Sequence, residues 1–329
     1  MKRFLGLLAL LSTLLLCLGG CAPEAARYHE TAAASYGDRT VYLDEANFWL
    51  RYYENYFNSY EAPLYYYAYG VKDFWRMPSG NHGQSFAEAL KESVMAEFLQ
   101  TYVLLDHADA YDVSLSEEDL ARIDLAVEKL QGSFGEDLSA MGAAYTAEQV
   151  KQYLTDRSLA IRVHEAVKAA AGVQAADDGT VFYRLSYFLV PPAEKSSTEE
   201  APTGEVLVRR LRLDLAGGLP AEDVAENWGA ALRTATFARN LIDANERFLS
   251  MRTQDMKEGE VRVIDAESGW YVVKCEKVGD EEAAAAHLKE QQDALEEKAF
   301  TEIYREWAAA APAFTVKRCF FRLKLHDPV

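Results

Sequence analysis

The spacing of apolar side chains constrains the fold of this chain more than any other feature. Over residues 44–170, and again over 281–309, apolar residues recur at steps of three and four. This spacing places them on one face of an α-helix. Two helix starts are also marked, because Ser116 precedes one apolar run and Thr146 is followed by Gln149 in a capping box. Both ends of the chain are therefore predicted to be helical.

Between these helical stretches the sequence changes character near Gly172. Val181–Val190 is rich in β-branched and aromatic residues and stops at two prolines, which predicts a strand. Further along the chain, the pattern predicts a polar loop at 193–204, helices near 207–215 and after Pro220, two short strands between 259 and 275, and a last strand over Phe314–Leu325. The predicted fold class is α+β, mostly helical.

The first twenty residues predict a secretion signal. Two cations, Lys2 and Arg3, precede an uncharged apolar run that is shorter than the roughly 20 residues of a membrane span. The run ends in Leu18-Gly19-Gly20-Cys21, a bacterial lipobox in which the Cys21 thiol accepts the lipid. We expect residues 1–20 to be removed and residues 21–40 to form a lipid-anchored tether. The expected location is extracytoplasmic, on the bacterial cell membrane.

The net charge, the histidines and the cysteines limit which partners, cofactors and disulfides we expect for this chain. The net charge is −18 at pH 7, so the chain would repel a phosphate backbone, and nucleic acid is not expected as a partner. The histidines are scattered without metal-ligand spacing, and we expect neither a metal nor another cofactor. Beyond the signal segment and Cys21, the cysteines are Cys275 and Cys319. In an oxidising compartment these two would form a disulfide or stay reduced, and their spacing does not decide which.

A dense run of aromatic residues lies between Phe48 and Trp75. Aromatic rings at helical spacing usually belong to a core, but the stripe over residues 48–60 is too wide for one buried face, so some rings should be exposed. Tyrosine and tryptophan supply large amphipathic contacts with little loss of rotamer freedom, which suits loose capture of unfolded chains. The candidate residues for this contact are Trp49, Tyr53, Tyr56 and Tyr60.

The order of elements resembles the secreted foldases of the PrsA and SurA type. The similarity rests on Gly218–Ala225, on Gly259-Glu260-Val261, on Gly269–Lys274 and, more weakly, on Trp75 and Tyr111–Ser114. It implies a helical chaperone-like domain that is interrupted by a small parvulin-like α+β domain. The implied boundaries are 41–175 for the N-terminal helical part, 176–279 for the parvulin-like domain, and 280–329 for the segment that completes the helical domain.

The sequence departs from the parvulin pattern at the residues that matter for catalysis. Tyr187 and Tyr271 stand where the family has histidines, and the glycine-rich hairpin between them is missing. The pocket phenylalanine of the family falls on Leu249, with Phe248 one residue away. These four residues are the candidate peptide pocket of a degenerate parvulin domain.

The resemblance and these departures together imply a membrane-anchored chaperone that binds unfolded or secreted polypeptides without strong isomerase catalysis. Two alternatives stay open. One is an active parvulin-type peptidyl-prolyl isomerase, and the other is an envelope scaffold or assembly lipoprotein with one fixed partner. The sequence does not indicate an oligomeric state.

Overall fold

The computed structural model describes every residue except 1–27, 29, 81–82, 141–145, 193–202 and 327–329. The predicted signal segment, Cys21 and most of the predicted polar loop therefore lie outside the described residues. None of the described helices is both long enough and apolar enough to cross a membrane. The chain is a mixed α+β protein that is mostly helical, which confirms the predicted fold class.

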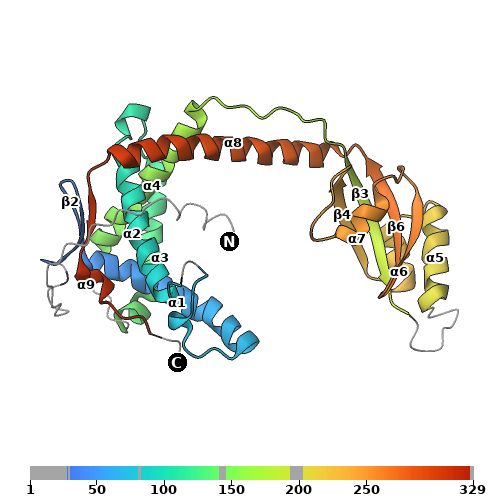
Figure 1. Ribbon diagram of the computed structural model, residues 1–329, viewed down its shortest axis with the longest axis horizontal. Coiled ribbons are helices and arrows are strands. Elements are labelled where there is room, and N and C mark those ends of the chain that lie inside the picture. The colour runs from blue at the N-terminus through green and yellow to red at the C-terminus, as the bar shows by residue number, and fades with distance from the viewer. Residues whose placement is uncertain (1–27, 29, 81–82, 141–145, 193–202, 327–329) are drawn as a thin grey trace. The chain divides into compact units, whose positions relative to one another are not determined.

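The chain divides into two compact units (Figure 1). Unit 1 comprises Met1–Gly172 together with Glu297–Val329, and unit 2 comprises Val173–Glu296. The second boundary falls between residues 296 and 297, inside helix α8 (Glu281–Ala310), and not at residue 280. The N-terminal half of α8 is thus part of unit 2 and its C-terminal half is part of unit 1.

Four long helices build most of unit 1: α1 (Leu43–Tyr69), α2 (Phe86–Leu105), α3 (Glu117–Ala140) and α4 (Ala147–Ala170). Short 3₁₀ helices, η3 (Phe74–Arg76) and η4 (Asp109–Tyr111), lie between them. The predicted caps are confirmed. The Thr146 hydroxyl accepts from the Gln149 backbone N–H, and the Gln149 side chain accepts from the Thr146 N–H at 2.8 Å. Ser116 and Asp119 exchange the same pair of bonds at the start of α3.

A three-stranded antiparallel sheet joins the two ends of unit 1. Its strands are β1 (Ala32–Tyr36), β2 (Arg39–Tyr42) and β7 (Phe314–Val316), in the order β2-β1-β7. The prediction that the tether continues to residue 40 is therefore wrong, because the chain is already part of the core from Ala33 onward. The last predicted strand is also too long. Only 314–316 pair with β1, and α9 (Arg318–Phe321) follows.

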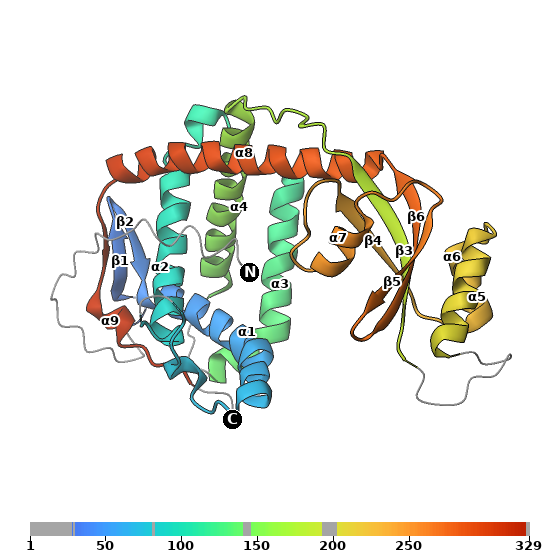
Figure 2. The ribbon, with the colours of Figure 1, turned by 45° about the vertical axis from the view of Figure 1, so that its right-hand side comes forward.

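The C-terminal half of α8 lies across α2 and α4 (Figures 1 and 2). Phe300 is fully buried and its ring contacts His164 edge-on, with ring centroids 4.1 Å apart. Trp307 stacks on His107 just beyond α2, with centroids 3.8 Å apart. In α8 only the C-terminal half buries apolar side chains, at Phe300 and Tyr304, whereas Leu288 and Leu295 are exposed.

The carboxyl group of Glu45, at the start of α1, has a raised pKa, and we therefore expect the stability of the protein to depend on pH. Burial and the neighbouring Asp44 carboxylate raise the pKa of Glu45 from 4.5 to about 7. The folded state therefore holds a proton that the unfolded state releases, so stability falls as pH rises from about 4.5 to 7. We expect Glu45→Gln to match the wild type at pH 5 and to exceed its free energy of unfolding by about 2 kcal/mol at pH 8.

Urea denaturation at the two pH values measures this difference. Glu128→Gln, which removes an exposed carboxylate from α3, is the matched control and should show no such change. If Glu45→Gln follows the same pH profile as the wild type, Glu45 is not the group responsible.

Unit 2 is built around a four-stranded antiparallel sheet with the order β4-β3-β6-β5. The strands are β3 (Phe182–Val190), β4 (Leu232–Ala238), β5 (Val261–Ala266) and β6 (Gly269–Val278), and the helices are α5 (Gly204–Ala216), α6 (Ala221–Trp228) and α7 (Arg247–Thr253). The helices α5 and α6 cover one face of the sheet and α7 lies against the other (Figure 2).

Side chains along β3 point alternately to the two faces of the sheet, and each face has its own hydrophobic core. Tyr183, Leu185 and Tyr187 face α7, whereas Phe188 and Val190 pack with α5 and α6. A central strand that is buried on both faces is expected to be rich in β-branched and aromatic residues, as this one is. The central strand β3 thus fixes which face carries the candidate pocket.

Candidate peptide-binding site

The candidate pocket residues of unit 2 come together on the α7 face of the sheet. Tyr187 lies on β3 opposite Val273, and Tyr271 lies on β6 opposite Leu189. Because side chains alternate along a strand, this register puts both phenols on the same face as diagonal neighbours. Their ring centroids are 5.9 Å apart, and the planes are tilted by 39°.

Helix α7 supplies the other two predicted residues. Leu249 is almost fully buried in the core beneath the sheet, whereas Phe248 is partly exposed and its ring lies 5.6 Å from that of Tyr271. Consecutive helical residues point about 100° apart, so one of the two must face the core while the other faces the tyrosines. The aromatic contact is therefore made by Phe248, with the Arg252 guanidinium 5.5 Å from its ring centroid.

The surroundings of Tyr187 favour the neutral form of its phenol group. Burial and the nearby Glu246 carboxylate raise the pKa of Tyr187 above its usual value, against an opposing effect of Arg233 on the neighbouring strand. The phenol can donate a hydrogen bond to a carbonyl group, but it does not change charge near neutral pH. The cluster consists of Tyr187, Tyr271, Phe248 and Leu249, and none of these four residues is a histidine.

The aromatic residues of α1 separate into buried and exposed sets. Trp49 is 5% exposed and packs against Tyr153 at a centroid distance of 4.1 Å, so its prediction as a client-binding residue is wrong. Tyr53 is half-buried and its hydroxyl donates to Glu97 at 2.9 Å. Tyr56 and Tyr60 are exposed, which agrees with the prediction that the stripe is too wide for one buried face.

Further exposed residues follow on the same helix and were not among the predicted contact residues. They are Leu64, Tyr66, Tyr67 and Tyr69, and the exposed fraction of Tyr67 reaches 84%. Helix α1 continues through Pro63 to Tyr69, which carries this set into solvent. The sequence signal was the tyrosine-rich run itself, but a proline inside a helical pattern usually ends the helix.

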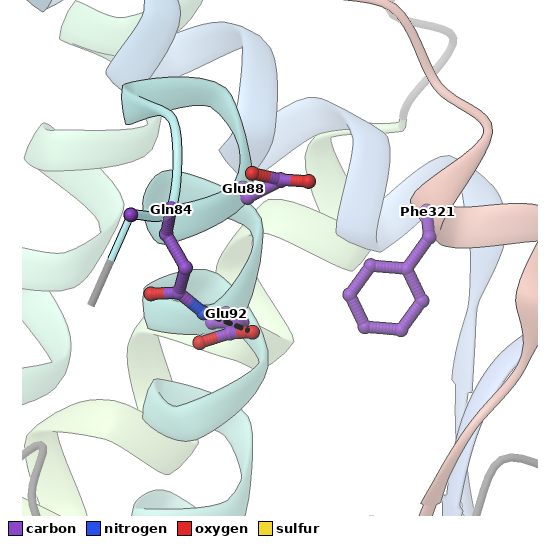
Figure 3. A pocket seen from close by; sticks show the side chains of 5 residues that line it. Gln84, Glu88, Glu92 and Phe321 are labelled. Carbon is purple, nitrogen blue, oxygen red and sulfur yellow. Dashed lines mark hydrogen bonds between the residues drawn. The ribbon is translucent and has the colours of Figure 1, made fainter. Parts of the chain in front are cut away.

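The described residues of unit 1 line cavities near α2 and on α1. The first, of about 370 Å³, is lined by Gly83, Gln84, Glu88, Glu92 and Phe321 (Figure 3). Its carboxylates already serve the local structure, because Glu88 completes a capping box with Ser85 and Glu92 accepts from Gln84 Nε2 at 2.8 Å. Hydrogen bonds from Ser85 also hold the pKa of Glu88 below its usual value.

The second cavity, of about 540 Å³, lies on the exposed end of α1. It is lined by Glu61, Leu64, Tyr65, Ala68, Tyr69 and Met77. Neither of these two cavities includes the tyrosines of unit 2.

The two cysteines do not form a disulfide. Cys275 is buried in β6, and its thiol donates to the Lys277 carbonyl oxygen. Cys319 is buried in α9, and its thiol donates to the Ala32 carbonyl oxygen at 3.3 Å. Cys275 belongs to unit 2 and Cys319 to unit 1.

The comparisons with known proteins give structural neighbours only. No family model matches the chain, and no curated protein matches it. The similar solved structures are PrsA proteins and a SurA-like chaperone. PrsA from Bacillus subtilis shares 15% identity with a TM-score of 0.25, covering 73% of this chain and 93% of that one.

Two further structures complete the comparison. A SurA-like chaperone from Campylobacter jejuni shares 10% identity with a TM-score of 0.28, covering 88% of this chain and 99% of that one. The peptidylprolyl isomerase PrsA from Bacillus anthracis shares 14% identity with a TM-score of 0.23, covering 65% and 94%.

Proposed function

We propose that this chain is an extracytoplasmic, membrane-anchored chaperone that binds unfolded or secreted polypeptides without strong isomerase catalysis. The observation that carries the proposal is the exposed aromatic surface of α1, formed by Tyr56, Tyr60, Leu64, Tyr66, Tyr67 and Tyr69. A folded unit that keeps so many large rings in water incurs a cost that a binding role would explain. Tyrosine is well suited to this role, because its ring contacts apolar side chains while its hydroxyl stays hydrated.

A test of this surface is suppression of the aggregation of reduced, unfolded lysozyme, followed by light scattering. The protein used is the chain from Ala22 onward. We expect the double variant Tyr60→Ser/Tyr67→Ser to lose most of the suppression, because both rings are largely exposed and contribute little to the core. Tyr42→Ser removes an exposed tyrosine at the opposite end of α1 and should retain it. Equal suppression by all three proteins would contradict the role of the α1 surface.

The cluster on unit 2 supports peptide contact without catalysis. Rotation about a prolyl amide faces a barrier of about 18–20 kcal/mol, which an isomerase lowers by favouring the twisted amide. The Tyr187, Tyr271 and Phe248 rings offer apolar area and phenol groups, but no imidazole pair. We therefore propose that this face holds a peptide and leaves its proline isomers at the uncatalysed exchange rate.

Proline cis–trans exchange in a short peptide, measured by NMR, distinguishes this role from an active isomerase. The exchange rate should stay near the uncatalysed value, while Tyr271→Ala should weaken peptide binding. An accelerated exchange that Tyr187→Ala or Tyr271→Ala abolishes would identify the domain as a divergent isomerase.

The anchoring part of the proposal rests on the lipobox at Cys21, outside the described residues. Incorporation of a labelled fatty acid that persists in Cys21→Ser would contradict it.

A further inference from the structure

The exposed end of α1 carries a cavity with one charged wall. Glu61, Leu64, Tyr65, Ala68 and Tyr69 recur at steps of three and four along the helix, and therefore share one face. Met77, beyond the helix end, closes the cavity of about 540 Å³. The cavity thus combines one carboxylate with two aromatic rings and several apolar side chains.

The carboxylate of Glu61 is not neutralised locally. Among the described residues no lysine, arginine or histidine lies within ion-pair distance of it. The basic residues that flank Glu61 in the sequence do not pair with it, because Arg51 pairs with Glu54, and Lys72 and Arg76 are exposed and make no ion pair with Glu61. The whole chain carries a net charge of −18, so its field also draws cations toward this surface.

We infer that this cavity binds an arginine side chain within an extended apolar segment of polypeptide. A guanidinium group pairs with a carboxylate through two parallel N–H donors and stacks on aromatic faces. The rings of Tyr65 and Tyr69, 5.9 Å apart and tilted by 47°, supply such faces beside Glu61. Leu64, Ala68 and Met77 would contact the methylene stem and the flanking apolar residues. The inference rests on the proposed function and names the class of segment that it favours.

The test compares two peptides that differ in one group. Both have the same leucine- and serine-containing sequence, with arginine at the centre of one and citrulline at the centre of the other, since citrulline keeps the shape but not the charge. Binding to the chain from Ala22 onward is measured by isothermal titration calorimetry. We expect the arginine peptide to bind about five- to tenfold more tightly, because only its guanidinium group carries a positive charge that the Glu61 carboxylate and the tyrosine rings attract.

Three variants locate the effect. Glu61→Gln should remove the difference between the peptides, and Glu128→Gln, an exposed carboxylate on α3, should leave it unchanged. Tyr69→Ala should weaken binding of both peptides. Because the Tyr69 side chain is 76% exposed, the variant should keep the wild-type fold, which circular dichroism checks directly. A preference for arginine that survives Glu61→Gln would overturn the assignment to this cavity.

The outcomes also separate this inference from the proposed function. Equal binding of the two peptides by a protein that still suppresses lysozyme aggregation would overturn the arginine preference alone. Failure to bind either peptide together with failure to suppress aggregation would overturn both.

Discussion

Replacing Glu54 by alanine is expected to lower the free energy of unfolding of unit 1 by about 3–5 kcal/mol. Glu54 is fully buried on α1, where its carboxylate pairs with the buried guanidinium of Arg51 and accepts the backbone N–H of His326. Alanine would leave a buried cation without its counter-charge and a backbone donor without its acceptor. Both losses carry the desolvation cost of the group left behind.

The loss should extend to the C-terminal segment, which this site holds in place. The carbonyl oxygen of His326 accepts from Trp75 Nε1 at 3.0 Å and from Asn58 Nδ2 at 2.9 Å. Hydrogen exchange followed by mass spectrometry measures the effect on unit 1 and on unit 2 separately, and only unit 1 should change. The double variant Arg51→Met/Glu54→Leu is the control, since replacing both charges should cost less than Glu54→Ala. A double variant that is at least as unstable as the single one would contradict the buried-charge argument.

Gly269→Ala should destabilise unit 2 by about 3 kcal/mol or more. Gly269 is the first residue of β6 and has a φ of +131°, a backbone conformation that is strained for residues other than glycine. A methyl group there would come within 2.1 Å of the Val190 carbonyl oxygen and 2.9 Å of Pro191 Cα. Val190 is the last residue of the neighbouring central strand and Pro191 follows it directly, so neither atom can move without disturbing the end of β3.

The chain contains a matched control for this substitution. Gly259 also has a positive φ, +77°, but a methyl group there would meet no atom within 4 Å. Gly259→Ala should therefore cost only the backbone strain of about 1–2 kcal/mol. Protection of the β3 and β6 amides from hydrogen exchange measures both variants. Equal losses in the two would show that the close approach to Val190 is relieved elsewhere.

The parts of the fold that the sequence predicted are those with local signals. The helix cap at Ser116 and the capping box at Thr146 marked the starts of α3 and α4, and the run that stops at Pro191 marked β3. The glycines at 259 and 269 marked the hairpin of β5 and β6, and the structure gives the reason for Gly269 in its contact with the neighbouring strand. Each of these signals acts within a few residues of the element that it defines.

The parts that were missed depend on partners far away in the chain. Residues 32–36 carry no periodicity, but they become the central strand of a sheet because β2 pairs with them on one side and β7, from the far end of the sequence, pairs with them on the other. β4 is short and half-exposed, and only its pairing with β3 defines it. Trp49 was misplaced because the spacing of aromatic rings does not reveal that Tyr153 on α4 covers it. In the candidate site, the register of β3 and β6 brings Tyr187 and Tyr271 together. The exposed tyrosines beyond Pro63 could not be predicted, because the sequence does not show that α1 continues past this proline.

The pairing of Ala34 with Val316 sets an order of events for a chain that is synthesised from its N-terminus. Unit 2 is continuous in sequence, so all of its strands are available once residue 296 has emerged. Unit 1 cannot close its sheet until β7 arrives, and contacts of such long sequence separation form slowly. During that interval the aromatic helices of unit 1 lack the α8 contacts at Phe300 and Trp307. The segment from Glu297 onward therefore completes unit 1, and a truncation before Phe314 would remove β7 from the unit 1 sheet while leaving the sequence of unit 2 intact.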